Sequence, residues 1–198
     1  MDFSERAVAD SRDRDAWLAA RPDKIGASDA AKYAKLVSAP LYARDKIHNP
    51  FNGNAYTRHG NDREVGMLAH FRFPQNTIMY RSAGNARHVA TPDGIIDVGG
   101  EVVLAQCKTA VKPLPAKIPP AYQRQMWWEQ YVMGASRTLL IWEHHDGFQP
   151  VSMEPVGVWF YRDDDAIATL IQIADIVLGG LDAAARFKSE MQMEGTNR

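Results

Sequence analysis

A close succession of strand-like segments in the middle of the chain constrains its fold more than any other feature. The segments read TIMYRS, RHVAT, GIIDV and EVVLAQCK between residues 77 and 108, and the turn-forming sequences TPDG and VGG separate the later ones. Segments with helical character stand on both sides of this run. Such alternation favours an α/β fold with a central sheet flanked by helices.

The expected helices lie at residues 13–20, 28–37, 56–71, 121–133 and 163–188. Ser28 is predicted to cap the second helix, and Pro120 suits the first turn of the fourth. Gly179 and Gly180 could interrupt the last one. Two further strands are predicted at RTLLIWEH and VGVWFY.

The composition limits the class of protein. With 198 residues, 45% of them hydrophobic, the chain can bury one core, and we expect a single domain over 1–198. A net charge of -1 gives no overall attraction to nucleic acid, so a DNA partner would be held by a local patch. The polar start and the absence of a run of ~20 apolar residues predict a cytoplasmic protein that binds no membrane. A single cysteine, Cys107, excludes an intrachain disulfide and a cysteine-ligated iron–sulfur cluster.

Gln106 and Lys108 stand two positions apart on the strand EVVLAQCK and therefore share one of its faces, while Cys107 points the other way. Asp93 lies in TPDG, at the tip of a predicted hairpin, and Glu64 is a polar position on the helix 56–71. Carboxylate and amide oxygens are hard donors of the kind that Mg²⁺ prefers. A lysine beside them could orient an attacking water or stabilise charge on a phosphate, so this set indicates a hydrolytic phosphodiesterase.

Each of these features also has a simpler explanation. TPDG is an ordinary type I turn sequence, Glu64 could be a solvated helix residue, and a same-face Gln and Lys often mark an exposed strand edge. The order of the features, a helix acid, then a turn Asp, then a strand Gln-x-Lys, argues against coincidence.

Five motifs, taken together, resemble those of the YqaJ-like viral recombinases, which include the lambda-type phage exonucleases within the PD-(D/E)xK nuclease superfamily. The motifs, which span about residues 17–131, are AWLAARPDKIGASDAA, RHGNDREVGMLAHF, VATPDGIID, VLAQCK and PPAYQRQMWWEQYVMG. The resemblance implies a restriction-endonuclease-like core with a central mixed sheet flanked by helices.

The resemblance also implies a site for Mg²⁺, with Mn²⁺ as a substitute. The residues implied to bind metal are Asp93, Gln106, Cys107 through its carbonyl, and Glu64, which would hold a second metal or its water. Lys108 would orient the nucleophile, and Gln125 would support Lys108 or the phosphate. All of these except Cys107 are expected to take part in catalysis.

Position 106 departs from the family pattern, which has a carboxylate there. An amide keeps an oxygen donor but removes one negative charge, so Mg²⁺ affinity should fall without the geometry collapsing. Gln106 could be a natural variant in an active enzyme, an introduced Glu→Gln change, or the mark of a degenerate nuclease that only binds DNA. Glu101 is a poor substitute because it lies on the opposite face of the strand.

The resemblance assigns the 5'-phosphate of the DNA to Arg21, Ser28 and Thr91. A helix start favours an anion, although Ser28 could equally be only a helix cap. Residues 105–128 contain basic side chains and no acid. These side chains could track DNA phosphates or belong to a solvated loop.

The implied protein is a Mg²⁺-dependent exonuclease that degrades linear double-stranded DNA in the 5'-to-3' direction during phage recombination. It would act as a ring-shaped homotrimer with a single-strand annealing protein, in the cytoplasm of a bacterial host. Two alternatives stay open: a related PD-(D/E)xK endonuclease, and an inactive protein of the same fold that binds DNA ends.

Overall fold

Two β-sheets organise the computed structural model, which describes residues 3–48 and 55–196. The larger sheet contains β4 (Gly94–Val98), β5 (Glu101–Ala110), β6 (Arg137–Asp146), β7 (Gln149–Pro150) and β8 (Val156–Tyr161). β5 and β6 are parallel and the other pairings are antiparallel, so this sheet is mixed, as predicted. The smaller, antiparallel sheet contains β1 (Ala7–Asp10), β2 (Ile78–Arg81) and β3 (Val89–Ala90).

The centre of the larger sheet is apolar on both faces. β5 buries the apolar residues 102–105 and β6 buries the apolar residues 139–142. A strand that is covered on both sides needs such a continuous apolar run. The parallel β5 and β6 are joined through a helix, α5 (Pro120–Met133), as a crossover between parallel strands requires.

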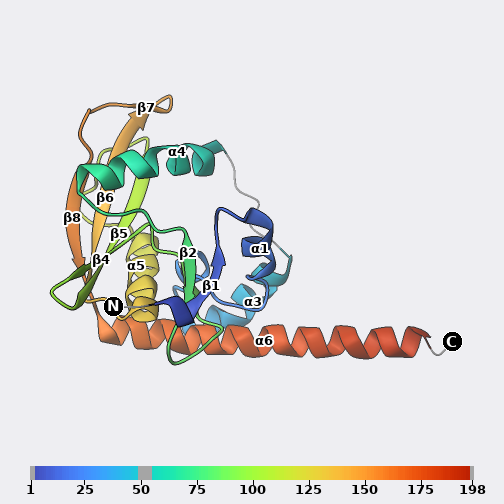
Figure 1. Ribbon diagram of the computed structural model, residues 1–198. Coiled ribbons are helices and arrows are strands. Elements are labelled where there is room, and N and C mark those ends of the chain that lie inside the picture. The colour runs from blue at the N-terminus through green and yellow to red at the C-terminus, as the bar shows by residue number, and fades with distance from the viewer. Residues whose placement is uncertain (1–2, 49–54, 197–198) are drawn as a thin grey trace.

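Helices cover both faces of this sheet. The helices of the described chain are α1 (Arg14–Ala19), α2 (Ala27–Ala30), α3 (Ala39–His48), α4 (Ala55–His70), α5 and α6 (Asp164–Thr196), with 3₁₀ turns η1 (Ser4–Arg6) and η2 (Leu36–Ser38). On one face, Leu68 of α4 packs with Ala105, and on the other, Trp128 of α5 packs with Leu104. α5 also contacts β3, so it lies between the two sheets (Figure 1).

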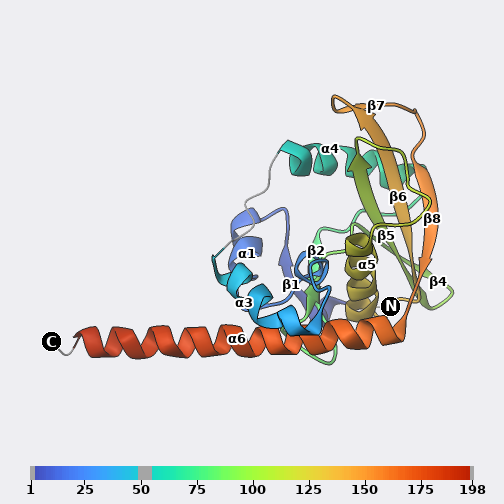
Figure 2. The ribbon, with the colours of Figure 1, turned by 180° about the vertical axis from the view of Figure 1, so that it is seen from behind.

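The last helix, α6, runs along the base of the molecule against α3 and α5, and its C-terminal part extends past them (Figure 2). It continues through Gly179 and Gly180, so the predicted interruption is wrong. A Cβ atom at Gly180 would lie 2.9 Å from the Cβ of Ala43, which means that glycine here allows α3 to approach closely.

Residues 164–192 of α6 are long and apolar enough, by composition, to cross a membrane, which the sequence analysis did not predict. The side chains of Leu170, Ile173, Ala174 and Val177 are buried in the core. This packing accounts for part of the apolar composition of α6.

Two further predictions need correction. Ser28 does not cap its helix, because Gly26 occupies the N-cap and the Asp29 carboxylate accepts a hydrogen bond from the Gly26 amide at 2.9 Å. That helix also stops at Ala30, since Tyr33 is buried against Tyr42 and the chain leaves helical geometry. Asp93 is not at a hairpin tip, because β3 pairs with β2 and β4 pairs with β5, so TPDG crosses from one sheet to the other.

Candidate active site

Asp93 and Gln106 are brought together by the pairing of β4 with β5. Gly94 lies opposite Ala105, so the residue before β4 faces the residue that follows Ala105 on β5. The Asp93 Oδ2 atom accepts a hydrogen bond from the Gln106 amide at 2.5 Å and one from the Cys107 backbone N–H at 2.7 Å. The polar Gln106 side chain is buried, as a residue of an interior strand, and the alternative of an exposed strand edge is therefore wrong.

The hydrogen bonds continue from β5 to α5. The Gln125 Nε2 atom donates to Gln106 Oε1 at 2.9 Å and to Glu129 Oε1 at 3.0 Å. Gln125 and Glu129 are four positions apart on α5, so both side chains lie on the helix face that looks toward β5. Asp93, Gln106, Gln125 and Glu129 thus form one continuous polar chain, which we call the amide relay.

Lys108 and Glu64 lie beside the amide relay. Lys108 follows Gln106 on the same face of β5, and its Nζ atom lies 5.1 Å from the centroid of the Tyr122 ring. Glu64 comes from α4, on the other side of the sheet, and accepts a hydrogen bond from the Gln75 amide at 2.9 Å. It is half-buried, so the alternative of a fully solvated helix residue is wrong.

Burial shifts the pKa values of these carboxyl groups upward. Burial, together with the charge of Asp93, raises the pKa of Glu64 to about 7 and that of Glu129 to about 8. Burial also raises the pKa of Asp93, against the opposing charge of Lys108. Each group resists ionisation because it is desolvated, and the charge of Asp93 adds to that resistance in Glu64 and Glu129.

The donors around Asp93 fit a divalent cation. Asp93 and Glu64 offer carboxylate oxygens, and the Cys107 carbonyl lies 3.4 Å from the Gln106 amide nitrogen. Gln106 would add its amide oxygen once the side chain turns, because its nitrogen faces Asp93 and its oxygen accepts a hydrogen bond from Gln125. These are the hard oxygen ligands that Mg²⁺ prefers. Within residues 3–48 and 55–196, no three His, Cys, Asp or Glu side chains form a ligand cluster, so amide and backbone oxygens would have to complete the coordination.

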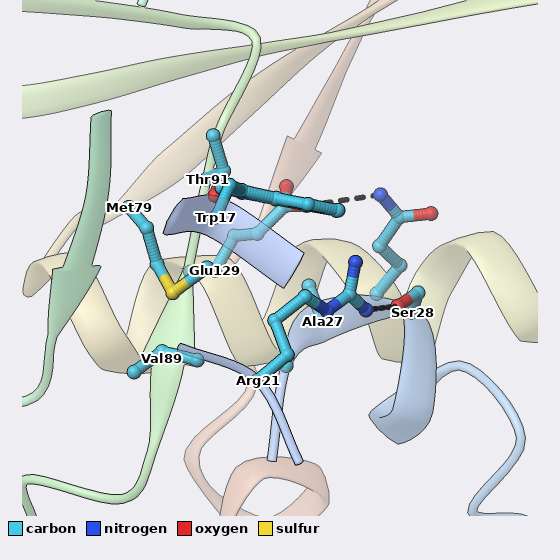
Figure 3. Close-up of a pocket in the computed structure, with 11 residues that line it drawn as sticks. Trp17, Arg21, Ala27, Ser28, Met79, Val89, Thr91 and Glu129 are labelled. Atoms are coloured by element: carbon cyan, nitrogen blue, oxygen red, sulfur yellow. Dashed lines mark hydrogen bonds between the residues drawn. The ribbon is translucent and has the colours of Figure 1, made fainter. Parts of the chain in front are cut away.

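A cavity of about 200 Å³ opens next to the amide relay (Figure 3). The three residues predicted to receive a 5'-phosphate all line it, and Gln125 and Glu129 form part of its wall; its remaining lining residues are Trp17, Gly26, Ala27, Met79, Val89 and Ala90. Arg21 donates a hydrogen bond to Ser28 Oγ at 2.9 Å, and its guanidinium stacks 4.2 Å from the centroid of the Trp17 ring. The structure therefore brings Arg21, Ser28 and Thr91 together.

The basic side chains of residues 105–128 lie in two different environments. Arg124 donates to the Ala31 carbonyl at 2.9 Å and so anchors α2, while Lys112 and Lys117 are exposed on the loop between β5 and α5.

Two residues of the site were missed by the sequence analysis, namely Glu129 and Gln75. Glu129 could have been noticed as an acid between the buried positions Trp128 and Val132. No sequence signal points to Gln75.

Comparisons with known proteins identify a family and a fold for this chain. The family of the YqaJ-like viral recombinase domain matches residues 16–136. No curated protein sequence matches the chain.

Three solved structures share the fold. The alkaline exonuclease LHK-Exo of Laribacter hongkongensis is 20% identical with a TM-score of 0.68, over 91% of this chain and 98% of that chain. Its complex with dAMP gives 21% identity and a TM-score of 0.70 over the same shares. A phage related exonuclease of Haemophilus somnus 129PT is 15% identical with a TM-score of 0.61, over 85% of this chain and 96% of that chain. The chain therefore has the restriction-endonuclease-like fold of phage-type exonucleases.

Proposed function

Since this chain belongs to the YqaJ-like viral recombinase family, we propose that it is a Mg²⁺-dependent exonuclease that degrades linear double-stranded DNA from 5'-phosphorylated ends in the 5'-to-3' direction. Membership of this family implies a nuclease that acts in phage recombination. The observation that carries the proposal is the buried Asp93–Gln106 pair, with Lys108 beside it. Gln125 joins this pair to the wall of the cavity that Arg21 and Ser28 also line.

The residues that would hold the cation are Asp93, Gln106 and Cys107 through its carbonyl, with Glu64 as ligand to a second cation or its water. A cation bound there would stabilise the negative charge that develops on the scissile phosphate. Lys108 would orient the attacking water and compensate part of that charge. Gln125 would support Lys108 or the phosphate, and it would release its hydrogen bond to Gln106 Oε1 when that oxygen turns toward the cation.

The cavity would receive the 5'-phosphate of the DNA. Arg21, held by Trp17 and Ser28, offers a preorganised guanidinium, and the hydroxyl groups of Ser28 and Thr91 add hydrogen-bond donors. The volume is smaller than that of a typical drug-sized ligand site and suits a phosphate group. LHK-Exo, which shares the fold, forms a complex with dAMP.

Retention on DNA would depend on assembly. A net charge of -1 gives little general attraction to DNA, and a ring-shaped homotrimer around the duplex would hold the substrate instead. The proposed setting is the cytoplasm of a bacterial host, with a single-strand annealing protein as the partner.

One observation favours a second candidate, a catalytically impaired protein that binds DNA ends. The Gln106 amide group donates to Asp93, so a donor faces the carboxylate at the place where a cation would otherwise lie. Cation binding would require this side chain to turn its oxygen toward Asp93.

Digestion assays separate these candidates. The substrates are linear duplex DNA with and without a 5'-phosphate and relaxed circular DNA, each in Mg²⁺ and in EDTA. The exonuclease proposal predicts Mg²⁺-dependent loss of phosphorylated linear DNA and intact circles. Cleaved circles would indicate an endonuclease, and end binding without any product would indicate the impaired protein.

A further inference from the structure

Glu129 is a buried carboxylate with an unused oxygen. Its side chain is 1% exposed, Oε1 accepts the hydrogen bond from Gln125, and Oε2 has no hydrogen-bond partner among the described residues. Leaving a buried acceptor unpaired is costly, so such an atom in a native structure calls for a partner, and a bound ion is one that fits a carboxylate.

No basic side chain of the described residues forms a hydrogen bond with Glu129 Oε2. Figure 3 shows Glu129 extending from α5 into the cavity that Arg21 and Thr91 also line. Arg21 donates to Ser28 and forms no ion pair with Glu129 within the described part of the chain. The missing partner of Glu129 is therefore not Arg21.

Glu129 lies close to position 106. The Gln125 Nε2 atom donates to Gln106 Oε1 at 2.9 Å and to Glu129 Oε1 at 3.0 Å. The distance between the two oxygens therefore cannot exceed the sum of these two distances. A carboxylate on α5 thus stands next to the strand position at which this chain has an amide.

The charges around the site favour a divalent cation. Asp93, Glu64 and Glu129 all feel the charge of Lys108, and Asp93 acts on the other two carboxyl groups. When ionised, three carboxylates and one lysine leave an excess of two negative charges, which a divalent cation neutralises. Without Glu129 the excess would be only one, because position 106 is neutral.

We propose that Glu129 supplies the metal site with the negative charge that Gln106 lacks, so that the carboxylate of the site is relocated from β5 to α5. The inference rests on the proposed metal-dependent nuclease function and deepens it. Glu129 acts on the cation through space and through Gln125, as a positioning residue.

The test measures Mn²⁺ binding by calorimetry after EDTA has been removed. Four full-length proteins are compared: the unchanged chain, Glu129→Gln, Gln106→Glu/Glu129→Gln, and Glu101→Gln. Glutamine at position 129 can still accept the Gln125 hydrogen bond, so the first substitution removes charge and keeps shape. The double substitution returns the charge to β5. Glu101 lies at the far end of β5 and is the matched control for loss of one carboxylate.

The proposal predicts that Glu129→Gln weakens Mn²⁺ binding at least about tenfold, as loss of a supporting group around a metal commonly does. The double variant should bind within about threefold of the unchanged chain, and Glu101→Gln should bind as the unchanged chain does. Thermal unfolding confirms that each variant is folded.

The proposal is overturned if Glu129→Gln binds Mn²⁺ normally, if the double variant is as weak as Glu129→Gln, or if the unchanged chain binds no Mn²⁺. Cleavage of DNA is measured in parallel. If the binding pattern holds but no protein cleaves DNA, the role of Glu129 stands and the proposed nuclease function fails.

Discussion

Replacing Glu129 by Gln should stabilise the metal-free protein at alkaline pH. Burial, aided by the charge of Asp93, raises the pKa of Glu129 from 4.5 to about 8 in the folded state, so folding favours the protonated carboxyl. The stability that this preference provides is complete below pH 4.5 and is lost as the pH rises through 8. Between pH 6 and pH 9 the unchanged protein should lose about 2 to 3 kcal/mol relative to the variant.

Thermal unfolding in EDTA measures this difference. For a protein of this size, about 2 to 3 kcal/mol corresponds to a Tm difference that widens by roughly 5 to 10 °C between pH 6 and pH 9. Glu190→Gln, an exposed change on α6, is the control and should show no such widening. A Tm difference between Glu129→Gln and the unchanged protein that stays constant with pH would refute the reasoning.

Three further predictions concern other residues. Burial raises the pKa of Glu64 to about 7, so a proton competes with the cation below that pH, and calorimetry should show Mn²⁺ affinity falling about fivefold from pH 7 to pH 6; an unchanged affinity would contradict a ligand role. Gly94→Ala would place a Cβ atom 2.9 Å from Leu68 Cδ2, and urea unfolding should show a loss of about 1 to 3 kcal/mol. Arg63→Ala removes a two-pronged ion pair from buried Glu143 and should cost about 3 kcal/mol by the same assay, whereas a loss under about 1 kcal/mol would contradict that pairing.

Local periodicity explains how much of the fold could be predicted. The alternation along β5 correctly placed Gln106 and Lys108 on one face, toward α5, and Cys107 on the other, toward α4. The wrong predictions concern tertiary contacts. TPDG crosses between sheets because β3 pairs with β2 and β4 pairs with β5, and Gly180 lies inside a continuous helix at a point where its missing Cβ lets α3 approach closely.

The candidate site could be predicted only in part for the same reason. Asp93, Gln106 and Gln125 were each found from motifs, and the structure joins them by hydrogen bonds. Glu129 was not recognised as a motif residue. It is linked to the site through Gln125, which forms hydrogen bonds with both Gln106 and Glu129. A sequence shows the residue types but not this shared contact.

The central claim is that the group around Asp93 and Lys108 hydrolyses DNA. The most direct test is the Mg²⁺-dependent digestion rate of 5'-phosphorylated linear duplex by the unchanged chain, Lys108→Ala and Lys112→Ala, with DNA binding and Tm measured alongside. Lys112 is an exposed lysine on the loop after β5, so its variant is the matched control for loss of a positive charge. The account predicts that Lys108→Ala loses at least about a hundredfold in rate while still folding and binding DNA ends, and that Lys112→Ala stays close to the unchanged chain. Equal rates for Lys108→Ala and the unchanged chain would contradict the account.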